Sequence, residues 1–281
     1  MTTSTHNNLL AIAIRASFAA GKEILEVYKN DFEVNYKEDQ SPLTLADQAA
    51  HKVISAYLEE TGFPLLSEEG RHLPYDERKA WDKLWIVDPL DGTKEFIKRN
   101  GEFTVNIAFV ERNKPTMGVI FCPTLNILYF ADESIGGSYK AVLGDDWTDQ
   151  DPNIEDMIQS AVQLPQKDPR DHFTVVASRS HLNDDTKSFV SNIEKQVGKI
   201  QFISRGSSLK LCMVAEGKAD LYPRFAPTSE WDTAAGQAIV EYSGGKVILQ
   251  DTGKAMSYNK ADLLNPWFLV MGKGIEDQLS L

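Results

Sequence analysis

Near the start of the chain, apolar residues recur at three- and four-residue spacing, which is typical of one face of an amphipathic helix. The residues that share this spacing are Leu9, Ile12, Ala16, Ala20, Ile24 and Val27. The pattern predicts a helix over 8–29. A second helix is predicted over 44–60, because Thr44 is a good N-cap and Gly62 suits the position just after a helix end.

Further along, the apolar positions come in short runs bounded by turn residues, which predicts strands. The expected strands lie near 64–67, 84–88, 103–111, 117–122 and 126–131. Because the turns between them are short, the pattern favours an antiparallel sheet. After residue 170, strands near 173–178 and 200–204 alternate with helices near 184–197, 207–216 and 231–243. That alternation is typical of an α/β unit.

These patterns predict an α+β lobe over 1–143 and an α/β lobe over 171–281. The stretch between them, 144–170, is acidic and contains proline, so we expect it to connect the lobes. A chain of 281 residues is long enough for one large core or for two fused lobes. We expect the two lobes to work as one integrated unit.

Composition narrows the classes of function. A net charge of −12 argues against binding a nucleic-acid polymer, which needs an extended basic surface, but allows a small anionic ligand. Cys122 and Cys212 lie far apart in apolar segments, which predicts buried free thiols in a reducing compartment. Neither a signal peptide nor an apolar run of the roughly 18 residues of a membrane span is evident. We expect a cytoplasmic protein, with the inner face of the membrane as an alternative place and the oligomeric state open.

Candidate chemistry appears where the apolar run 85–87 ends in Asp88 and Asp91, followed at once by Gly92 and Thr93. Two acids at the end of a buried strand are costly unless a cation is present. Glycine lets the backbone turn and present N–H groups, and threonine adds a hydroxyl. This combination points to metal-assisted phosphate chemistry, with an ordinary Asp-Pro-Gly turn as the alternative.

Two more acids have similar settings. Glu68 ends another short apolar run, and Asp232 lies near the start of an apolar helical segment. Alone, the first reads as a solvated strand end and the second as an acid favoured by the helix dipole. Together with Asp88 and Asp91 they form a set of oxygen donors with no Cys or His beside them. Such a set suits Mg²⁺ and argues against zinc.

The three motifs at 67–69, 85–93 and 231–236, in this order, resemble those of the inositol monophosphatase superfamily of Mg²⁺-dependent, lithium-sensitive phosphatases. The resemblance extends from the first helix to about Val270. Within the superfamily, residues 94–106 resemble the bacterial type of the 3′(2′),5′-bisphosphate nucleotidase branch. The resemblance implies a layered αβαβα sandwich with two lobes and the active site between them.

The resemblance also implies a metal site that holds two or three Mg²⁺ ions and includes the catalytic Glu68. The implied ligands are Glu68, Asp88, Asp91, Asp232 and the backbone carbonyl of Leu90. Mg²⁺ in such a site supplies hydroxide near neutral pH. The amides of Gly92 and Thr93 would neutralise phosphate oxygens, and no covalent enzyme nucleophile is required.

Asp47 has two interpretations that can both hold. It lies three residues after Thr44, which predicts a capping box at the start of a helix. The resemblance implies that it also hydrogen-bonds Thr93 and so polarises the threonine hydroxyl, which takes the proton of the attacking water.

The implied substrate is a bisphosphate nucleotide bound between the lobes. The implied substrate contacts are Glu68, Leu90, Asp91, Gly92, Thr93, Ser178, His181, Gly206, Ser207, Lys210, Arg224 and Asp232. His181 would stack on or hydrogen-bond a base, Ser207 and Lys210 would offer donors to a phosphate, and Arg224 would hold a second phosphate with its planar fork. Taken singly, each of these residues also fits a solvated charge or a helix cap. Lys94, Lys98 and Arg99 would shape only the rim.

The implied reaction removes the 3′-phosphate from adenosine 3′,5′-bisphosphate to give AMP and phosphate. The 5′-phosphosulfate analogue is a second candidate substrate, and the implied role is the clearing of a by-product of sulfate activation. Two alternatives stay open from sequence: an inositol monophosphatase, and a nucleotide sensor without turnover. The intact acids and Thr93 argue against the sensor.

Overall fold

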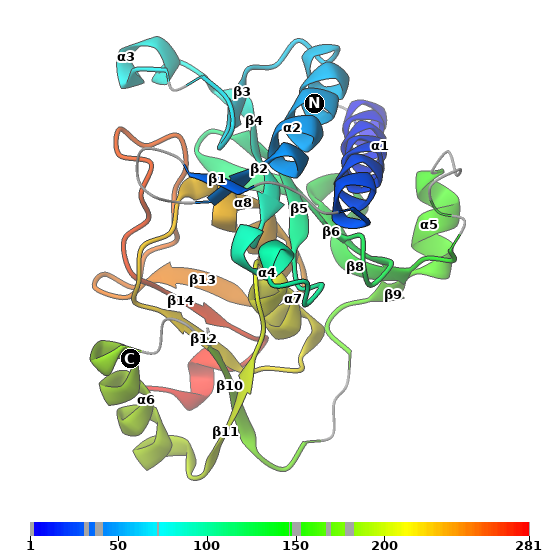
Figure 1. The fold of residues 1–281 in the computed structure, drawn as a ribbon. Helices are drawn as coiled ribbons and strands as arrows, with labels where there is room; N and C mark the ends of the chain where they lie inside the picture. Colours follow the sequence, from blue (N-terminus) through cyan, green and yellow to red (C-terminus); the bar gives the residue numbers. More distant parts are fainter. Residues whose placement is uncertain are drawn as a thin grey trace.

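The fold alternates layers of helices and sheets in a computed structural model (Figure 1). The structure describes residues 3–30, 34–36, 42–71, 73–145, 147, 153–166, 170–177 and 183–280. In order, the layers are a helix pair, a large sheet, a second helix pair, a smaller sheet and a single helix. The predicted αβαβα sandwich is therefore confirmed.

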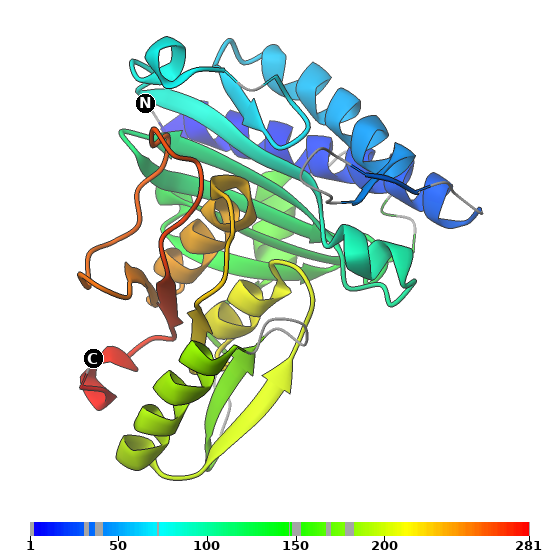
Figure 2. The ribbon, with the colours of Figure 1, turned by 60° about the vertical axis from the view of Figure 1, so that its left-hand side comes forward.

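The first layer consists of α1 (Thr3–Tyr28) and α2 (Leu45–Glu59), which lie side by side over one face of the large sheet (Figure 2). Both overlap the helices expected from the apolar spacing. Ile14 and Ile24 of α1 are buried in the same cluster as Trp85 and Val87 of the sheet.

The large sheet has the strand order β3-β4-β5-β6-β7-β8-β9. Its strands are β3 (Leu65–Ser67), β4 (Lys83–Asp91), β5 (Thr104–Glu111), β6 (Lys114–Cys122), β7 (Ile127–Asp132), β8 (Gly137–Val142) and β9 (Val162–Gln163). From β4 to β9 each neighbouring pair is antiparallel, which confirms the expectation for the predicted strands β4 to β7. Strand β8 was not predicted. The expectation is wrong for β3 and β4, which are parallel. The reason is that the segment between them contains α3 (Tyr75–Arg78) and returns the chain to the same end of the sheet.

Part of the expected connection, 144–170, packs with the first lobe. It contains α5 (Ile154–Ser160), whose Ile154 and Met157 join the cluster under α1, and β9, which pairs with β8. Neither element was predicted from the sequence.

The smaller sheet has the order β11-β10-β12-β14-β13. Its strands are β10 (Phe173–Ala177), β11 (Ile200–Ser204), β12 (Leu221–Arg224), β13 (Lys246–Leu249) and β14 (Phe268–Met271). Strands β11, β10 and β12 are parallel, as is typical of an α/β unit, whereas β14 is antiparallel to both of its neighbours. The last three strands were missed, because each is only four residues long and β12 contains Pro223.

The two sheets share α7 (Leu209–Glu216) and α8 (Glu230–Tyr242), which lie between them, while α6 (Asp184–Val197) covers the outer face of the smaller sheet (Figures 1 and 2). One buried cluster runs through this middle layer, from Ile86 of the large sheet through Ile239 of α8 to Phe268 of the smaller one. Helix α8 is thereby packed between the two sheets.

The remaining elements are short: β1 (Val34–Tyr36), β2 (Pro42–Thr44), α4 (Thr93–Ile97), η1 (Glu133–Ile135) and η3 (Glu276–Gln278). Cys122 and Cys212 are buried free thiols, as expected. Among the helices that the structure describes, none has the length and apolar character needed to span a membrane.

Candidate metal and phosphate site

Three carboxylates from distant parts of the chain meet at one end of the large sheet. Glu68 follows β3, Asp88 lies within β4, and Asp232 lies in the first turn of α8. One oxygen from each lies within 4.8 Å of the others. Asp88 is only 1% exposed, while Glu68 and Asp232 are partly exposed, so the cluster opens toward solvent on one side.

An irregularity in β4 brings Asp91 beside this group. Asp88 pairs with Asn106 of β5 and Asp91 pairs with Thr104, so β4 has one extra residue between these pairs. Bulges of this kind redirect side chains and are common beside active sites. The bulge contains Pro89, which has no N–H to donate to a regular ladder. The Asp-Pro-Leu-Asp sequence therefore folds as the end of a strand and not as an isolated turn.

The carboxylates raise one another's pKa values. Burial, followed by the charges of neighbouring carboxylates, raises the pKa of Asp88 well above its usual range. Burial also raises the pKa of Asp91 to about 6, although Lys210 opposes the shift. Burial and then the charge of Asp91 raise the pKa of Asp232 to about 7. Such a group is costly to keep ionised within the protein alone.

This donor set fits a hard divalent cation. Its protein atoms are carboxylate oxygens, which Mg²⁺ prefers, and a bound cation would offset the repulsion that raises the pKa values. The structure brings Glu68, Asp88, Asp91 and Asp232 close together, while their role as metal ligands stays a prediction. The backbone of Leu90 lies in the same segment, where its N–H donates to Asp88 Oδ1 at 3.0 Å.

Asp47 takes part in both of the arrangements considered for it. Its Oδ2 accepts from the N–H and the hydroxyl of Thr44, each at 2.7 Å, which completes the capping box of α2. Its Oδ1 accepts from the Thr93 hydroxyl at 3.3 Å. The same hydroxyl lies 3.4 Å from the carbonyl oxygen of Leu90. Thr93 is therefore held between α2 and the acid-bearing segment.

Gly92 makes the turn from β4 into α4 possible. Its φ of +93° lies in the left-handed region that favours glycine. It is the N-cap residue of α4, and Thr93 begins that helix. The local sequence thus turns sharply just after Asp91 and places the Thr93 hydroxyl beside Asp47.

A cavity of about 150 Å³ lies between two of the acids, Asp91 and Asp232, and residues near α7 and β12. Its walls include Asp91, Gly92, Gly206, Ser207, Lys210, Arg224 and Asp232. Seven of the residues expected to contact substrate therefore line one cavity. Ser178 and His181, with Arg179 and Ser180 between them, lie outside the described residues.

Two cationic side chains, those of Lys210 and Arg224, line this cavity. Lys210 is buried, and burial lowers the pKa of its ammonium to about 8 against the opposing effect of Asp91. Its ammonium donates to the carbonyl oxygen of Ser207, and Arg224 Nη2 donates to that of Pro227 at 3.0 Å. The Lys210 ammonium also donates to the carbonyl oxygen of Arg205 at 3.4 Å. An ammonium has three donors and a guanidinium five, so these bonds do not exhaust the capacity of either.

Glu102 of the first lobe holds the loop before α7 through a hydrogen bond and an ion pair. The Gly206 N–H donates to Glu102 Oε2 at 2.8 Å, and Arg205 forms an ion pair with Glu102 at 3.2 Å. A Cβ on Gly206 would lie 2.6 Å from Glu95 Cγ, so only glycine fits there without movement. Lys94 and Glu95 also line the cavity.

Sequence reasoning assigned no role to a buried polar group behind Asp91. Asn106 Nδ2 donates to Asp91 Oδ2 at 3.4 Å, and Asn106 Oδ1 accepts from Ser208 at 2.8 Å and from Thr104 at 3.1 Å. Asn106 thus orients a carboxylate of the cluster and connects it to the start of α7. The available signal was an amide within an otherwise apolar strand.

A larger hollow of about 1060 Å³ opens beside α6 and β11. Residues such as Arg170, His172 and Lys199 line it, and it shares no lining residue with the acid cluster. Arg170 is bonded to Asp220 and to the carbonyl oxygens of Gly217 and Lys218. We therefore place the chemistry at the smaller cavity.

The chain is similar to several known proteins. A model of the inositol monophosphatase family matches residues 6–276. The 3′(2′),5′-bisphosphate nucleotidase CysQ of Salmonella typhimurium is 44% identical over 257 residues, covering 89% of this chain and 94% of that protein. The crystal structure of CysQ from Bacteroides thetaiotaomicron, described as a bacterial member of the inositol monophosphatase family, matches with a TM-score of 0.86 and 50% identity. That match covers 95% of this chain and 98% of the other.

A more distantly related structure shares the same fold. The extragenic suppressor protein suhB from Bartonella henselae matches with a TM-score of 0.71 at 22% identity, covering 96% of this chain and 95% of that one. At that identity the likeness concerns the fold alone.

Proposed function

The chain belongs to the inositol monophosphatase family, and on that premise we propose that it is a Mg²⁺-dependent phosphomonoesterase that hydrolyses adenosine 3′,5′-bisphosphate to AMP and phosphate. One observation carries the proposal: Asp91 and Asp232 share the walls of a single cavity with Lys210 and Arg224. A phosphate at the acids and a second anionic group at the cations would fit that arrangement.

Glu68, Asp88, Asp91 and Asp232, with the carbonyl oxygen of Leu90, would hold two or three Mg²⁺ ions. When bound, Mg²⁺ supplies Lewis acidity, which makes a nucleophile from water near neutral pH and neutralises charge on the phosphate. Asn106 supports the site by holding Asp91 in place. Glu68 is the ligand that we also expect to act in catalysis.

Thr93 and Asp47 would handle the proton. The Thr93 hydroxyl donates to Asp47 Oδ1, so its oxygen could accept the proton of the attacking water while its own proton passes to Asp47 Oδ1. Asp47 is fixed by two bonds from Thr44, which orients the pair in advance. The backbone amides of Gly92 and Thr93 would stabilise charge on the phosphate oxygens.

Lys210 and Arg224 would select the nucleotide. Both are cations of the second lobe, and both line the cavity beside the acids. We propose that they bind the phosphate that is not hydrolysed, with Gly206 and Ser207 at the same wall. Ser178 and His181 are proposed to contact the nucleoside, and the 5′-phosphosulfate analogue is proposed as a second substrate.

We also propose that residues 1–143 and 171–281 act as two lobes joined by 144–170. The acids Glu68, Asp88 and Asp91 come from the first lobe and Asp232 from the second. Neither lobe alone would complete the site, so the two form one catalytic unit. The proposed place of action is the cytoplasm, where the free thiols Cys122 and Cys212 would stay reduced.

Phosphate release tests the proposal. Purified protein is assayed with Mg²⁺ against adenosine 3′,5′-bisphosphate, its 5′-phosphosulfate analogue, AMP and inositol 1-phosphate. We expect fastest release from a bisphosphate nucleotide, with AMP as product. A preference for inositol 1-phosphate would favour the inositol phosphatase alternative, and nucleotide binding without phosphate release would favour the sensor.

A further inference from the structure

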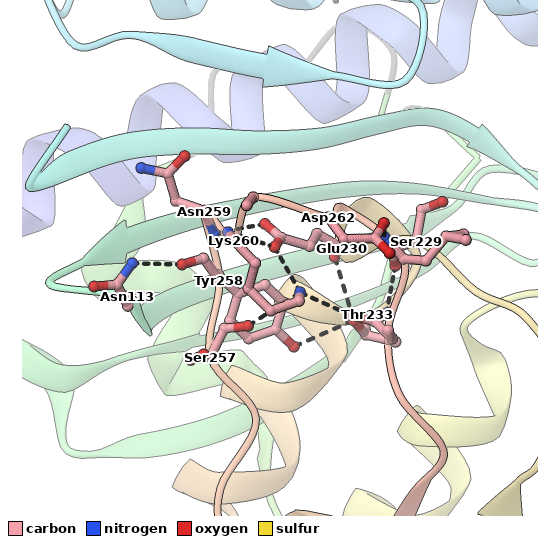
Figure 3. Close-up of polar contacts among 12 residues, drawn as sticks. Asn113, Ser229, Glu230, Thr233, Ser257, Tyr258, Asn259, Lys260 and Asp262 are labelled. Carbon is pink, nitrogen blue, oxygen red and sulfur yellow. Dashed lines mark hydrogen bonds and ion pairs between the residues drawn. The ribbon is translucent and has the colours of Figure 1, made fainter. Parts of the chain in front are cut away.

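A second buried carboxylate lies at the start of α8, two residues before Asp232. Glu230 is the first residue of that helix and is 0% exposed. The Asn259 N–H donates to its Oε2 at 2.6 Å, and the Lys260 N–H donates to its Oε1 at 2.9 Å. The Lys260 ammonium reaches the same Oε1 at 2.6 Å, and Figure 3 shows Glu230 and Lys260 pointing toward each other. The protein itself thus neutralises this charge.

Asn259 and Lys260 belong to the loop between β13 and β14, and this loop is hydrogen-bonded to the segment that follows Glu68. Arg78, the last residue of α3, is 2% exposed, and its Nη1 donates to Asn259 Oδ1 at 2.9 Å. In return Asn259 Nδ2 donates to the Arg78 carbonyl oxygen at 2.8 Å. Arg78 Nη2 also donates to the carbonyl oxygen of Ala261 at 3.0 Å. Asn259 has a φ of +59°, a left-handed conformation that asparagine tolerates better than most residues.

The loop holds the backbone at the start of α8 as well. Asn265 Nδ2 donates to the Ser229 carbonyl oxygen at 2.7 Å, and the Glu230 N–H donates to the carbonyl oxygen of Leu263 at 3.0 Å. The Ser229 N–H in turn donates to Asp232 Oδ2 at 2.8 Å. Figure 3 shows Ser229, Glu230 and Thr233 gathered against this loop. A shift of Glu230 would therefore move the atoms that orient Asp232.

Arg78, Asn259, Glu230 and Lys260 are linked by hydrogen bonds, and we call these four residues the Glu230 network. We propose that the Glu230 network sets the distance between Glu68 and Asp232. These two acids come from segments far apart in the sequence, and the network bonds one segment to the other. Glu230 is a positioning residue, since it contacts neither substrate nor metal in this scheme. The inference rests on the proposed role of Glu68 and Asp232 as metal ligands.

The physical reason is the narrow tolerance of a metal site. Ligand atoms must lie within a few tenths of an ångström of their ideal places, and outer residues that orient ligands typically change metal affinity by about 10- to 100-fold. Glu230→Gln keeps the shape of the side chain but replaces one acceptor oxygen with an NH₂ group. That group would face the N–H or ammonium donors that now bind the carboxylate, so the start of α8 must move.

The test compares Glu230→Gln with a matched control, Glu216→Gln. Glu216 is also a buried helical glutamate, and it accepts from Tyr129 and from the ammonium groups of Lys140 at 2.9 Å and Lys218 at 2.8 Å. It lies at the opposite end of α7 from the acid cavity. Mn²⁺ binding to each folded variant is measured by electron paramagnetic resonance, and unfolding is followed by circular dichroism without metal.

We expect both substitutions to lower the unfolding temperature but only Glu230→Gln to weaken Mn²⁺ binding, by about 10- to 100-fold. Unchanged Mn²⁺ affinity in folded Glu230→Gln, or equal weakening in Glu216→Gln, would overturn the inference. Should Glu230→Gln not fold, Lys260→Met decides in the same way, because it removes the ammonium and leaves both backbone donors. Failure of the wild-type protein to bind Mn²⁺ would instead refute the metal site itself and this inference with it.

Discussion

Buried carboxylates lie on both sides of the start of α8, and the charges that surround them differ. In the acid cluster, Asp88 is surrounded by other acids, and their charges raise its pKa. In the Glu230 network, the carboxylate is buried more completely but accepts three hydrogen bonds, one of them from an ammonium group. Burial is common to both regions, while the source of the positive charge differs.

The charge of the groups around a buried carboxylate distinguishes a functional acid from a structural one. A buried charge needs a partner, and where the protein supplies it, as Lys260 does for Glu230, the group is complete without a ligand. Where the neighbours have the same sign, as around Asp88, the partner must come from outside. The acid cluster is therefore the region that a cation should stabilise, and the Glu230 network is the region that should stabilise the fold.

The strongest test of this comparison is Asp88→Asn. An amide keeps the shape and the acceptor for the Leu90 N–H but loses the charge, so metal-dependent turnover should fall by about 10³-fold or more, corresponding to several kcal/mol of transition-state stabilisation. Because the change also removes like-charge repulsion, the metal-free variant should unfold at a higher temperature than the wild-type protein. Steady-state assays and metal-free thermal unfolding measure the two effects.

Glu230→Gln is the control for that stability change, since it should lower the unfolding temperature. If both substitutions destabilise the metal-free protein to a similar degree, the two regions do not differ in the way described.

Thr93→Val tests Asp47, a carboxylate that has hydrogen-bond donors within the protein and also a proposed role in the chemistry. Asp47 has its own hydrogen-bond donors, as Glu230 does, yet it is proposed to act in the chemistry through Thr93. Loss of the hydroxyl should lower kcat by roughly 10²- to 10⁴-fold, the usual contribution of a positioned proton acceptor. Mn²⁺ affinity should stay unchanged. Thr93→Ser keeps the hydroxyl and should retain most of the activity; an unaltered kcat in Thr93→Val rules out the pair.

Lys210 and Arg224 extend the comparison to the substrate, because both are cations that line the cavity with Asp91 and Asp232. Charged donors are typically worth about 1.5–3 kcal/mol each, so Lys210→Met or Arg224→Met should weaken specificity for adenosine 3′,5′-bisphosphate by roughly 10- to 150-fold. The effect should fall mainly on KM if the contact is equal in the ground and transition states. Inositol 1-phosphate, assayed in parallel, serves as the reference substrate. Equal small losses on both substrates would contradict nucleotide selection.

The acids of the cluster have local signals in the sequence, since Asp88 and Asp91 end an apolar strand and Asp232 opens an apolar helix. Taken alone, Glu68 and Asp232 also fit an ordinary strand end and a helix start, so their grouping as predicted metal ligands came from the order of the three motifs and the family that this order resembles. The two helices of the first layer follow from apolar spacing, which is a local signal too. The parallel pairing of β3 with β4 was mispredicted because it depends on where the chain returns after α3, which no short pattern records.

The supporting contacts could not be predicted, because their partners are far apart in the chain. Asn106 meets Ser208 across 102 positions, and Arg78 meets Asn259 across 181. A buried amide or glutamate has many possible partners in the sequence, and only the packing of the two sheets selects one. The sequence shows Glu230 only as an acid at the start of an apolar segment, and its burial and its bond to Lys260 are properties of the folded chain.

The smallest expected effect concerns pH. The pKa values of Asp91, about 6, and Asp232, about 7, lie above the ordinary value of 3.8. A carboxyl whose pKa is raised by folding binds more protons in the folded state, so its contribution to stability is fully present below about pH 4 and is lost as the pH rises through 6 and 7. The metal-free protein should therefore lose stability from these two groups between pH 4 and pH 8.

Bound Mg²⁺ should reverse that loss, because it holds the carboxylates in their charged form. The rise in unfolding temperature on adding Mg²⁺ to metal-free protein should be small at pH 5, where protons compete for the same oxygens, and larger at pH 8. For a chain of this size, each kcal/mol gained should raise the unfolding temperature by roughly 2–4 °C. Scanning calorimetry at pH 5, 6, 7 and 8 measures the rise, with Asp88→Asn as the variant in which it should nearly vanish. A rise of equal size at pH 5 and pH 8 would mean that Asp91 and Asp232 do not titrate against the metal, and the contrast with Glu230 would then rest on geometry alone.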